Sequence, residues 1–288
     1  MLESLPKEPD LWQYIRDVTA QLSEVLAVME RLAPLQFAEP WDNVGLLVEP
    51  VSVGKTVRLD DALLTIDLSD DVVSEAEAKG AKLIIAYHPP IFQGLKRLRH
   101  SQPNERVVMR CVAAGITVFS PHTALDAAPD GVNSWLAAAF GAGWRGPCVP
   151  SAADGRYGQG RFVRLQEAIS LSAAVQAVKQ QLGLAQLRVA AADAHASDAP
   201  VISSIAVCAG AGGSLFEKLS GYDLYVTGEM RHHDVRGRAL GGSSVILSEH
   251  SHTERGFLPV WAALLAAETD QRVNFHVSKW DREPLTLR

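Results

Sequence analysis

The chain has 288 residues, of which 47% are hydrophobic and 21% charged, as expected of a globular protein with one large or two ordinary domains. Its 27 basic and 33 acidic side chains give a formal net charge of −6, so we expect neither a nucleic-acid nor a membrane partner. No apolar run approaches the roughly 18 residues of a transmembrane helix. The N-terminus lacks signal-peptide features and the three cysteines form no C-x-x-C pair, which together predict a cytoplasmic protein.

Helices and buried strands alternate along the first half. Apolar residues at helical spacing predict a first helix over about Trp12 to Ala33. Ser69 and Gly80 are typical caps of a second helix. Asn104 and Gly115 would cap a third in the same way. Strands are predicted at Leu46–Val48, Asp61–Asp67, Ala81–Ala86 and Ile116–Phe119, and a further helix at Val132–Phe140.

The second half repeats this alternation after a glycine-rich stretch. Gly141 to Gly160 is the best candidate linker. Ser170 and Gly183 are typical caps of another helix. Strands are expected at Arg161–Leu165, Leu187–Ala191, Val201–Cys208, Tyr222–Val226, Val245–Leu247 and Val273–Val277. We therefore predict an α/β protein of two lobes, residues 1–145 and 146–288, with mixed, largely parallel sheets.

Histidines and acids follow several predicted strands, where ligand-binding groups collect in parallel α/β sheets. His88 follows the strand that ends at Ala86, and Asp126 comes soon after Phe119. His250 and Glu254 would share one face of a helix that begins there. Imidazole and carboxylate groups suit a divalent metal. The alternatives are a turn histidine at position 88, an Asx turn at 126, and a solvated helix face at 250 and 254.

Three other features lie near these strand ends. His122 is a candidate metal ligand or hydrogen-bond partner of a ligand carboxylate. Glu229 precedes His232 and His233, which point about 100° apart if helical, so at most one of them would line a cavity. A helix-start cluster beside the site is the favoured interpretation. The run Gly210-Ala211-Gly212-Gly213-Ser214 resembles a phosphate-binding loop, but a tight strand-to-helix turn is the default.

Several blocks, in this order along the chain, resemble the signature blocks of the Nif-three-like family, also called type-2 homologues of GTP cyclohydrolase I. They are Phe37–Leu46, Tyr87–Phe92, Ser120–Asp126, Tyr222–Met230 and Glu249–Gly256. The resemblance implies a ring-shaped homohexamer whose two-lobed subunits hold a dinuclear divalent metal site between the lobes. Carried over by position, the metal ligands are His88, Asp126, His250 and Glu254, with Glu254 as a candidate bridge. Tyr87 stands where many bacterial members have a histidine, so a phenol replaces one ligand of the usual set.

The ligand set and the resemblance predict a metal-dependent hydrolase of a nucleotide-like or pterin-like small molecule. His122 or Glu229 would serve as the proton shuttle. Opening of the GTP ring rests on the family name alone. The alternative is a non-enzymatic regulatory or adaptor protein that binds metal. A third hypothesis is a metal with a purely structural role. Mixed ligands allow zinc, manganese, iron, cobalt or nickel, with two ions per subunit implied. The short 141–160 connection predicts no long inserted domain.

Overall fold

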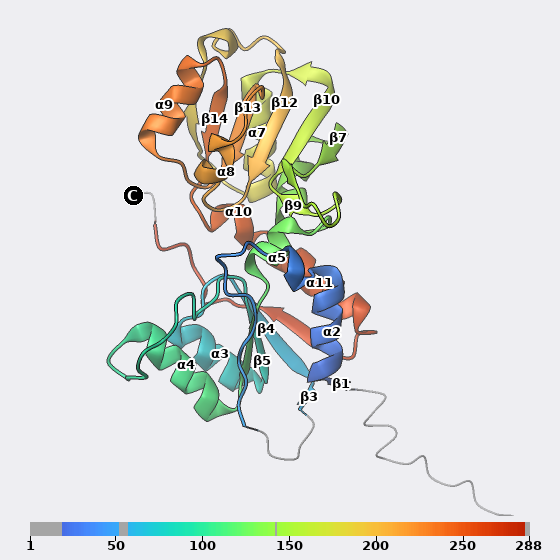
Figure 1. Cartoon of the computed structure of the whole chain (residues 1–288), viewed down its shortest axis with the longest axis vertical. Coiled ribbons are helices and arrows are strands. Elements are labelled where there is room, and N and C mark those ends of the chain that lie inside the picture. The colour runs from blue at the N-terminus through green and yellow to red at the C-terminus, as the bar shows by residue number, and fades with distance from the viewer. Residues whose placement is uncertain (1–18, 52–56, 142, 286–288) are drawn as a thin grey trace, which may run out of the picture.

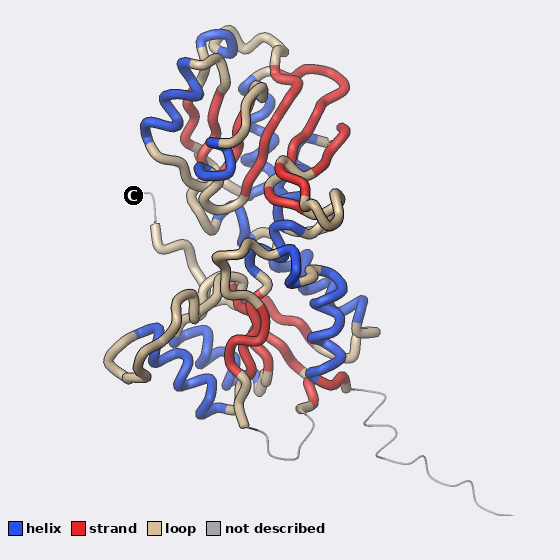
Figure 2. The backbone as a smooth tube through the Cα atoms, viewed as in Figure 1, coloured by secondary structure: helices blue, strands red, loops and turns tan. Residues whose placement is uncertain are grey.

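The computed structural model of the chain describes residues 19–51, 57–141 and 143–285. Two β-sheets with helices packed around them form two lobes along the long axis of the molecule (Figure 1). Figure 2 shows the strands as two separate groups, with helices and loops between them. This arrangement confirms the predicted α/β fold with mixed parallel and antiparallel sheets.

The sheet of the first lobe has five strands in the order β15-β4-β5-β6-β2. The first four run parallel, whereas β2 is antiparallel to β6. Because the central strands are buried on both faces, their sequences are nearly continuous apolar runs. The strands are β2 (Gly45–Val48), β4 (Asp61–Thr65), β5 (Leu83–Ala86), β6 (Thr117–Ser120) and β15 (Asn274–Val277).

Helices cover both faces of this sheet. On one side lie α3 (Asp70–Lys79) and α4 (Pro103–Ala114), and on the other α2 (Leu22–Leu32) and α11 (Leu258–Glu268) (Figure 1). Successive residues of β4 serve opposite faces, as the strand period of two requires. Leu63 packs with residues of α3 and α4, and Leu64 packs with residues of α2 and α11.

The sheet of the second lobe has six strands in the order β11-β14-β13-β12-β10-β7. Its centre, β12 to β14, is parallel, and β10, β7 and β11 are antiparallel to their neighbours. The strands are β7 (Gly143–Gly146), β10 (Arg161–Ile169), β11 (Arg188–Ala190), β12 (Ile202–Cys208), β13 (Leu224–Thr227) and β14 (Ser244–Leu247). The helices of this lobe are α7 (Leu171–Leu182), α8 (Gly213–Glu217) and α9 (His232–Leu240).

Local capping signals explain where α3 and α7 begin and end. The Ser69 hydroxyl accepts a hydrogen bond from the third residue of α3, and Gly80 ends the helix with a φ of 70°. Ser170 and Gly183, the latter at a φ of 67°, do the same for α7. Both helices therefore lie where the sequence predicts them.

Other boundaries differ from prediction. The α4 helix begins at Pro103, with Gln102 rather than Asn104 at the N-cap, because proline is well tolerated in the first turn. Within the described residues the first helix begins at Leu22, and residues 12–18 of its predicted range lie outside them. The candidate linker 141–160 contains β7 and a short ladder of β8 (Val149–Pro150) with β9 (Gly158–Gln159).

The last strand joins the first lobe. It was predicted in the second half, yet β15 pairs with β4 and places His276 opposite Leu63. The chain returns through α10 (His252–Arg255) and α11, so residues 258–277 pack in the lobe that was predicted to end at residue 145. Periodicity within a strand carries no information about a partner so distant in sequence, which is why this pairing was missed.

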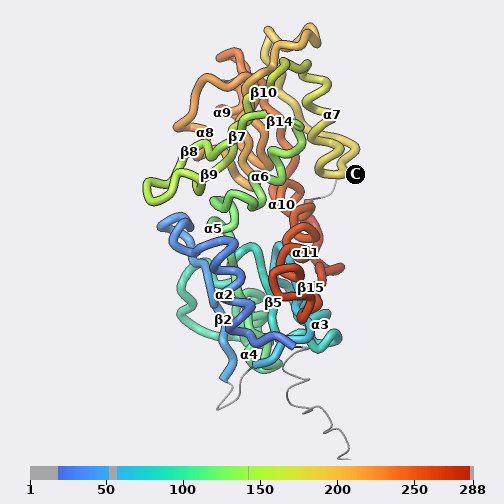
Figure 3. Tube along the Cα trace, turned by 90° about the vertical axis from the view of Figure 1, so that its right-hand side faces the viewer, coloured from blue at the N-terminus to red at the C-terminus, as the bar shows by residue number. Residues whose placement is uncertain are grey.

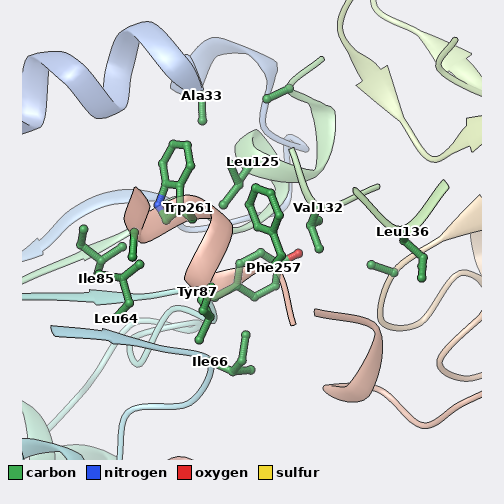
Figure 4. Close-up of a cluster of buried hydrophobic side chains, with 14 of the residues drawn as sticks. Ala33, Leu64, Ile66, Ile85, Tyr87, Leu125, Val132, Leu136, Phe257 and Trp261 are labelled. Atoms are coloured by element: carbon green, nitrogen blue, oxygen red, sulfur yellow. The ribbon is translucent and has the colours of Figure 1, made fainter. Parts of the chain in front are cut away.

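Three short helices lie between the lobes, and one hydrophobic cluster runs through both. Figures 1 and 3 place α5 (His122–Ala127), α6 (Val132–Ala137) and α10 at the junction. The cluster includes Leu64 of the first sheet and Ile246 of the second. Figure 4 shows part of it, where side chains from both sides of the junction meet around Tyr87, Leu125, Val132 and Phe257.

A buried arginine adds polar contacts at this junction. The side chain of Arg161, at the start of β10, donates to the carbonyl oxygens of Ala127 and Ala128 and to the hydroxyl of Ser134. Arg161 is only 3% exposed, so its guanidinium is itself buried and satisfied by these acceptors. The contacts fasten α5 and α6 to the second sheet.

Minor elements complete the described chain. They are β1 (Ala20–Gln21), which pairs with β3 (Arg58–Leu59), and three short 3-10 turns, η1 (Leu35–Phe37), η2 (Ala138–Phe140) and η3 (Asp193–His195). Among the helices of these residues, none has the length and apolar character needed to cross a bilayer.

Candidate metal centre

Polar residues that follow strands of both sheets meet between the lobes. In the first lobe, Asp67 follows β4 and His88 follows β5; in the second, Gly210 follows β12 and His250 follows β14. The ring centroids of His88 and His250 are 5.2 Å apart, so the carboxyl ends of the two sheets approach each other here. This is the edge at which parallel α/β sheets position ligand-binding groups.

Two imidazoles and one carboxylate converge at this point. His88 Nε2 lies 3.5 Å from Glu254 Oε2, and His250 Nε2 lies 3.3 Å from Glu254 Oε1. Among the described residues these side chains form the one group of three or more His, Cys, Asp or Glu whose ligand atoms all lie within 4.8 Å of one another. Ligands about 2.0–2.2 Å from a tetrahedral zinc ion are about 3.3–3.6 Å apart, which these separations match.

Two observations are compatible with a cation bound at this cluster. His88 Nε2 and Glu254 Oε2 are buried without a hydrogen-bond partner, a costly state unless another group binds them. Gly210, at a φ of 63°, passes so close that a Cβ there would lie 2.6 Å from Glu254 Oε1 and 2.9 Å from His250 Nε2. The backbone thus shapes the wall of the cluster, and the side chains present fit a divalent ion.

The charges of the cluster are strongly coupled. Burial disfavours the charged form of Glu254, but His250 and His88 outweigh it and lower the pKa of this carboxyl to about 2. Burial likewise opposes the charge of His88, yet the neighbouring carboxylates of Asp67 and Glu254 raise its pKa to about 10. Hydrogen bonding to Glu254 raises the pKa of His250 as well. Glu254 therefore stays ionised at neutral pH and depends on positive charge beside it.

The prediction that His250 and Glu254 meet through a helix holds only in part. The α10 helix begins at His252, so His250 lies in the turn before it. The Thr253 side chain donates to the His250 carbonyl at 2.6 Å and accepts from the Gly210 N–H at 2.7 Å. These bonds hold the turn so that the spacing of four still brings the two side chains together.

Asp67 contacts the cluster, although the sequence did not single it out. Its Oδ1 lies 2.9 Å from His88 Nδ1, on the side of the ring away from Glu254. A carboxylate on Nδ1 fixes the tautomer of an imidazole and leaves Nε2 for a metal. Asp67 closes a predicted strand two residues after Thr65, and strand-end acids were the signal that could have identified it.

Asp126, a predicted ligand, lies outside the converging group. The Tyr87 hydroxyl donates a hydrogen bond to Asp126 Oδ1. Burial raises the pKa of Asp126 to about 6, although nearby His122 and the bond from Tyr87 act in the opposite direction. The structure thus brings together His88, His250 and Glu254, and engages Asp126 with the phenol.

His122 lies beside the cluster. Its ring centroid is 5.4 Å from that of His88, and its Nδ1 lies 2.8 Å from Asp42 Oδ1. Asp42 also accepts from the N–H and hydroxyl of Thr123. Burial raises the pKa of Asp42, but these hydrogen bonds prevail and lower it. The sequence did not single out Asp42, and its contact with His122, 80 residues further along the chain, was not foreseen. His122 has a φ of 27°, an uncommon conformation that its surroundings maintain.

Glu229 reaches the cluster from the third strand end of the second lobe. Its Oε1 lies 3.4 Å from His250 Nδ1, and its side chain is 49% exposed. His232 and His233 are exposed at the start of α9 and take no part in the cluster, as the favoured interpretation predicts. The Gly210–Ser214 run forms the strand-to-helix turn that was the default expectation.

The fold and the site define an α/β protein with a candidate metal centre of two histidines and a glutamate between two sheets. A family model described as Duf34/NIF3 (NGG1p interacting factor 3) matches residues 20–284. The chain belongs to this family.

Similar proteins agree with this assignment. The chain is 39% identical to NIF3-like protein 1 of Drosophila melanogaster, over 92% of this chain and 88% of that protein. It is 38% identical to NGG1-interacting factor 3 of Saccharomyces cerevisiae, over 93% and 97%. The crystal structure of the Staphylococcus aureus hypothetical protein SA1388 shares the fold, with a TM-score of 0.80 at 22% identity, over 93% of this chain and 99% of that one.

Proposed function

We propose that this chain is a metal-dependent hydrolase that acts on a small nucleotide-like or pterin-like molecule. The observation that carries the proposal is the buried cluster of His88, His250 and Glu254, with two polar atoms that lack a hydrogen-bond partner. When bound, a divalent ion supplies a Lewis acid and a water molecule of lowered pKa, which are the requirements of hydrolysis. The three side chains would hold that ion.

A hollow beside the cluster supports a small polar substrate. Its volume is about 610 Å³, within the range of small-molecule sites, and its lining includes His88, Asp67, Phe92 and Lys96. Phe92 is half exposed and offers an aromatic face to a base or pterin ring. The Lys96 ammonium offers a cation to a phosphate or carboxylate. The lining of the hollow therefore combines a candidate metal ligand, His88, with Phe92, which suits an aromatic ring, and Lys96, which suits an anion.

His122 and Glu229 are proposed to move protons. Asp42 binds Nδ1 of His122 and so orients the ring, with Nε2 as the nitrogen left to exchange a proton with substrate. Glu229 is half exposed and lies next to His250, so its carboxylate connects the cluster with solvent. A general acid or base must reach the reacting group, and both residues border the cluster.

The test measures metal content and turnover in one preparation. Protein purified without chelators should contain divalent metal, and chromatography should detect hydrolysis of at least one nucleoside phosphate or pterin from a panel. The E254Q variant should lose both metal and turnover while its circular dichroism stays that of wild type. A folded protein that takes up neither zinc nor manganese would refute the proposal. A metal-loaded protein that hydrolyses nothing in the panel would favour the regulatory alternative.

We further propose that the chain works as a homohexamer in the cytoplasm. The support for the hexamer is the family resemblance of the five sequence blocks described above. The support for the compartment is that Cys111, Cys148 and Cys208 are free thiols, which suits a reducing environment. Sedimentation velocity should give a particle of about six chains, and a monomer at micromolar concentration would contradict the assembly.

A further inference from the structure

We infer that the centre holds one divalent ion, on His88, His250 and Glu254, and that Tyr87 keeps Asp126 out of the ligand set. This inference rests on the proposed function and deepens it, because it defines the ion with which that hydrolase works. It departs from the two ions on four ligands that the family resemblance implies.

The donor atoms that converge are sufficient for one ion. Two imidazoles and one carboxylate form the ligand set of several catalytic zinc sites, in which a further position stays open for water or substrate. Glu254 directs Oε2 toward His88 Nε2, at 3.5 Å, and Oε1 toward His250 Nε2, at 3.3 Å. One ligand atom from each of the three side chains lies within 4.8 Å of the other two, so a single ion can contact all of them.

Asp126 is engaged by a side chain that cannot move away. The Tyr87 hydroxyl donates to Asp126 Oδ1, and the Tyr87 residue is only 3% exposed. Its ring packs in the cluster that includes Leu125 and Phe257, as Figure 4 shows. Turning Asp126 toward an ion would leave the buried hydroxyl without a partner, which is unfavourable. Packing in the hydrophobic cluster thus fixes the position of the Tyr87 ring, and the hydrogen bond from its hydroxyl fixes the orientation of the Asp126 carboxylate.

Position 87 controls two potential ligands together. A histidine would offer the lone pair of a neutral imidazole nitrogen to a metal. Tyrosine instead offers a hydroxyl that donates its proton to Asp126, and a neutral phenol is a poor metal ligand. Tyr87 therefore takes the place of a histidine ligand, and its hydroxyl also engages Asp126, the neighbouring candidate ligand. His122 does not replace them, since among the described residues it lies outside the converging group.

The experiment counts ions per chain in matched variants. Protein is saturated with zinc, desalted, and analysed by elemental mass spectrometry, with circular dichroism confirming the fold. Wild type should hold about one ion per chain, as expected of a site with three protein ligands. D126N keeps the shape of the side chain and an oxygen acceptor for Tyr87, so it should also hold about one. E254Q should hold almost none.

Tyr87 is tested by adding a ligand. Y87H supplies an imidazole and releases Asp126, so its content should rise toward about two ions per chain. Y87F removes the hydroxyl without adding a ligand and should remain near the wild-type value. Two ions in wild type, or loss of the ion in D126N, would overturn the inference. A Y87H protein that still holds one ion would overturn the role of Tyr87. A wild-type protein with no ion would instead refute the proposed metal centre itself.

Discussion

The His88 ring is oriented by a carboxylate from the neighbouring strand. Asp67 Oδ1 lies 2.9 Å from His88 Nδ1, and the Asp67 side chain is 54% exposed, so the fold depends little on it. We therefore predict that D67N weakens zinc affinity about 10- to 100-fold, the effect typical of losing such a partner, with little change in Tm. Competition with a chromogenic chelator measures the affinity. D71N, at an exposed position in α3, is the control and should bind zinc like wild type. Equal affinities in both variants would contradict the role of Asp67.

A methyl group at position 210 should damage the same cluster from the backbone side. In G210A the new Cβ would lie 2.6 Å from Glu254 Oε1 and 2.9 Å from His250 Nε2, so the ligands must shift. The φ of 63° is also unfavourable for alanine, at about 1–3 kcal/mol. We expect zinc affinity to fall at least about tenfold in a chelator competition.

Gly221 offers the control for this change. Its φ is 80°, but a Cβ at this position would meet no other atom within 4 Å, so G221A incurs the backbone strain without the contact. G221A should lower Tm and leave zinc affinity unchanged. If both variants lost zinc equally, general destabilisation rather than the close approach of Gly210 would be the cause.

At the scale of elements, a partly buried carboxylate just before β13 ties that strand to β12. Asp223 Oδ2 accepts from the N–H groups of Ser203 and Ser204, both at 2.9 Å, and from the Ser204 hydroxyl at 2.8 Å. Burial raises the pKa of Asp223, but these hydrogen bonds outweigh it and lower the pKa below its usual value. The charged carboxylate therefore stabilises the fold above the unfolded-state pKa, and this stabilisation is lost as the pH falls through the lower folded-state pKa.

The pH dependence of the stability of D223N follows from the lowered folded-state pKa of Asp223. The variant replaces a charged acceptor by a neutral amide, so at pH 7 its Tm should be roughly 3–6 °C below that of wild type. Below about pH 4 the carboxyl is protonated in the unfolded chain before it is protonated in the folded protein, so the difference should begin to shrink and continue to shrink as the pH falls further. Thermal unfolding of both proteins between pH 7 and pH 3, followed by circular dichroism, measures this. A difference that stays constant with pH would show that the charge of Asp223 contributes nothing.

At the scale of the whole molecule, the sequence predicts helix ends better than it predicts contacts between residues that are far apart in the chain. The ends of α3 and α7 follow from Ser and Gly caps that lie within a few residues, and they were predicted. The pairing of β15 with β4 and the bond from Tyr87 to Asp126 join residues far apart in the chain. Strand-end placement indicated that His88 and His250 belong to one site, but the partners of those rings depend on packing that periodicity does not encode.

The return of the chain to the first lobe implies that the two lobes unfold together. One hydrophobic cluster includes Leu64 of the first sheet and Ile246 of the second, and Arg161 binds the junction helices. A lobe that unfolded alone would expose its half of that cluster, so we predict one cooperative transition with a ratio of calorimetric to van't Hoff enthalpy of about one. Scanning calorimetry of metal-free protein measures the ratio.

A variant at the junction sharpens this prediction. R161M removes the guanidinium that donates to the carbonyls of Ala127 and Ala128 and to the Ser134 hydroxyl, which should cost about 3 kcal/mol or more because several buried, charge-assisted hydrogen bonds are lost at once. If the lobes are coupled through the shared cluster, the single transition moves to lower temperature without dividing. The exposed neighbour Arg164 provides the control, and R164M should change the free energy of unfolding by no more than about 0.5 kcal/mol. Two resolved transitions in wild type would show instead that each lobe is an independent folding unit, and that the metal centre forms by docking of two already folded parts.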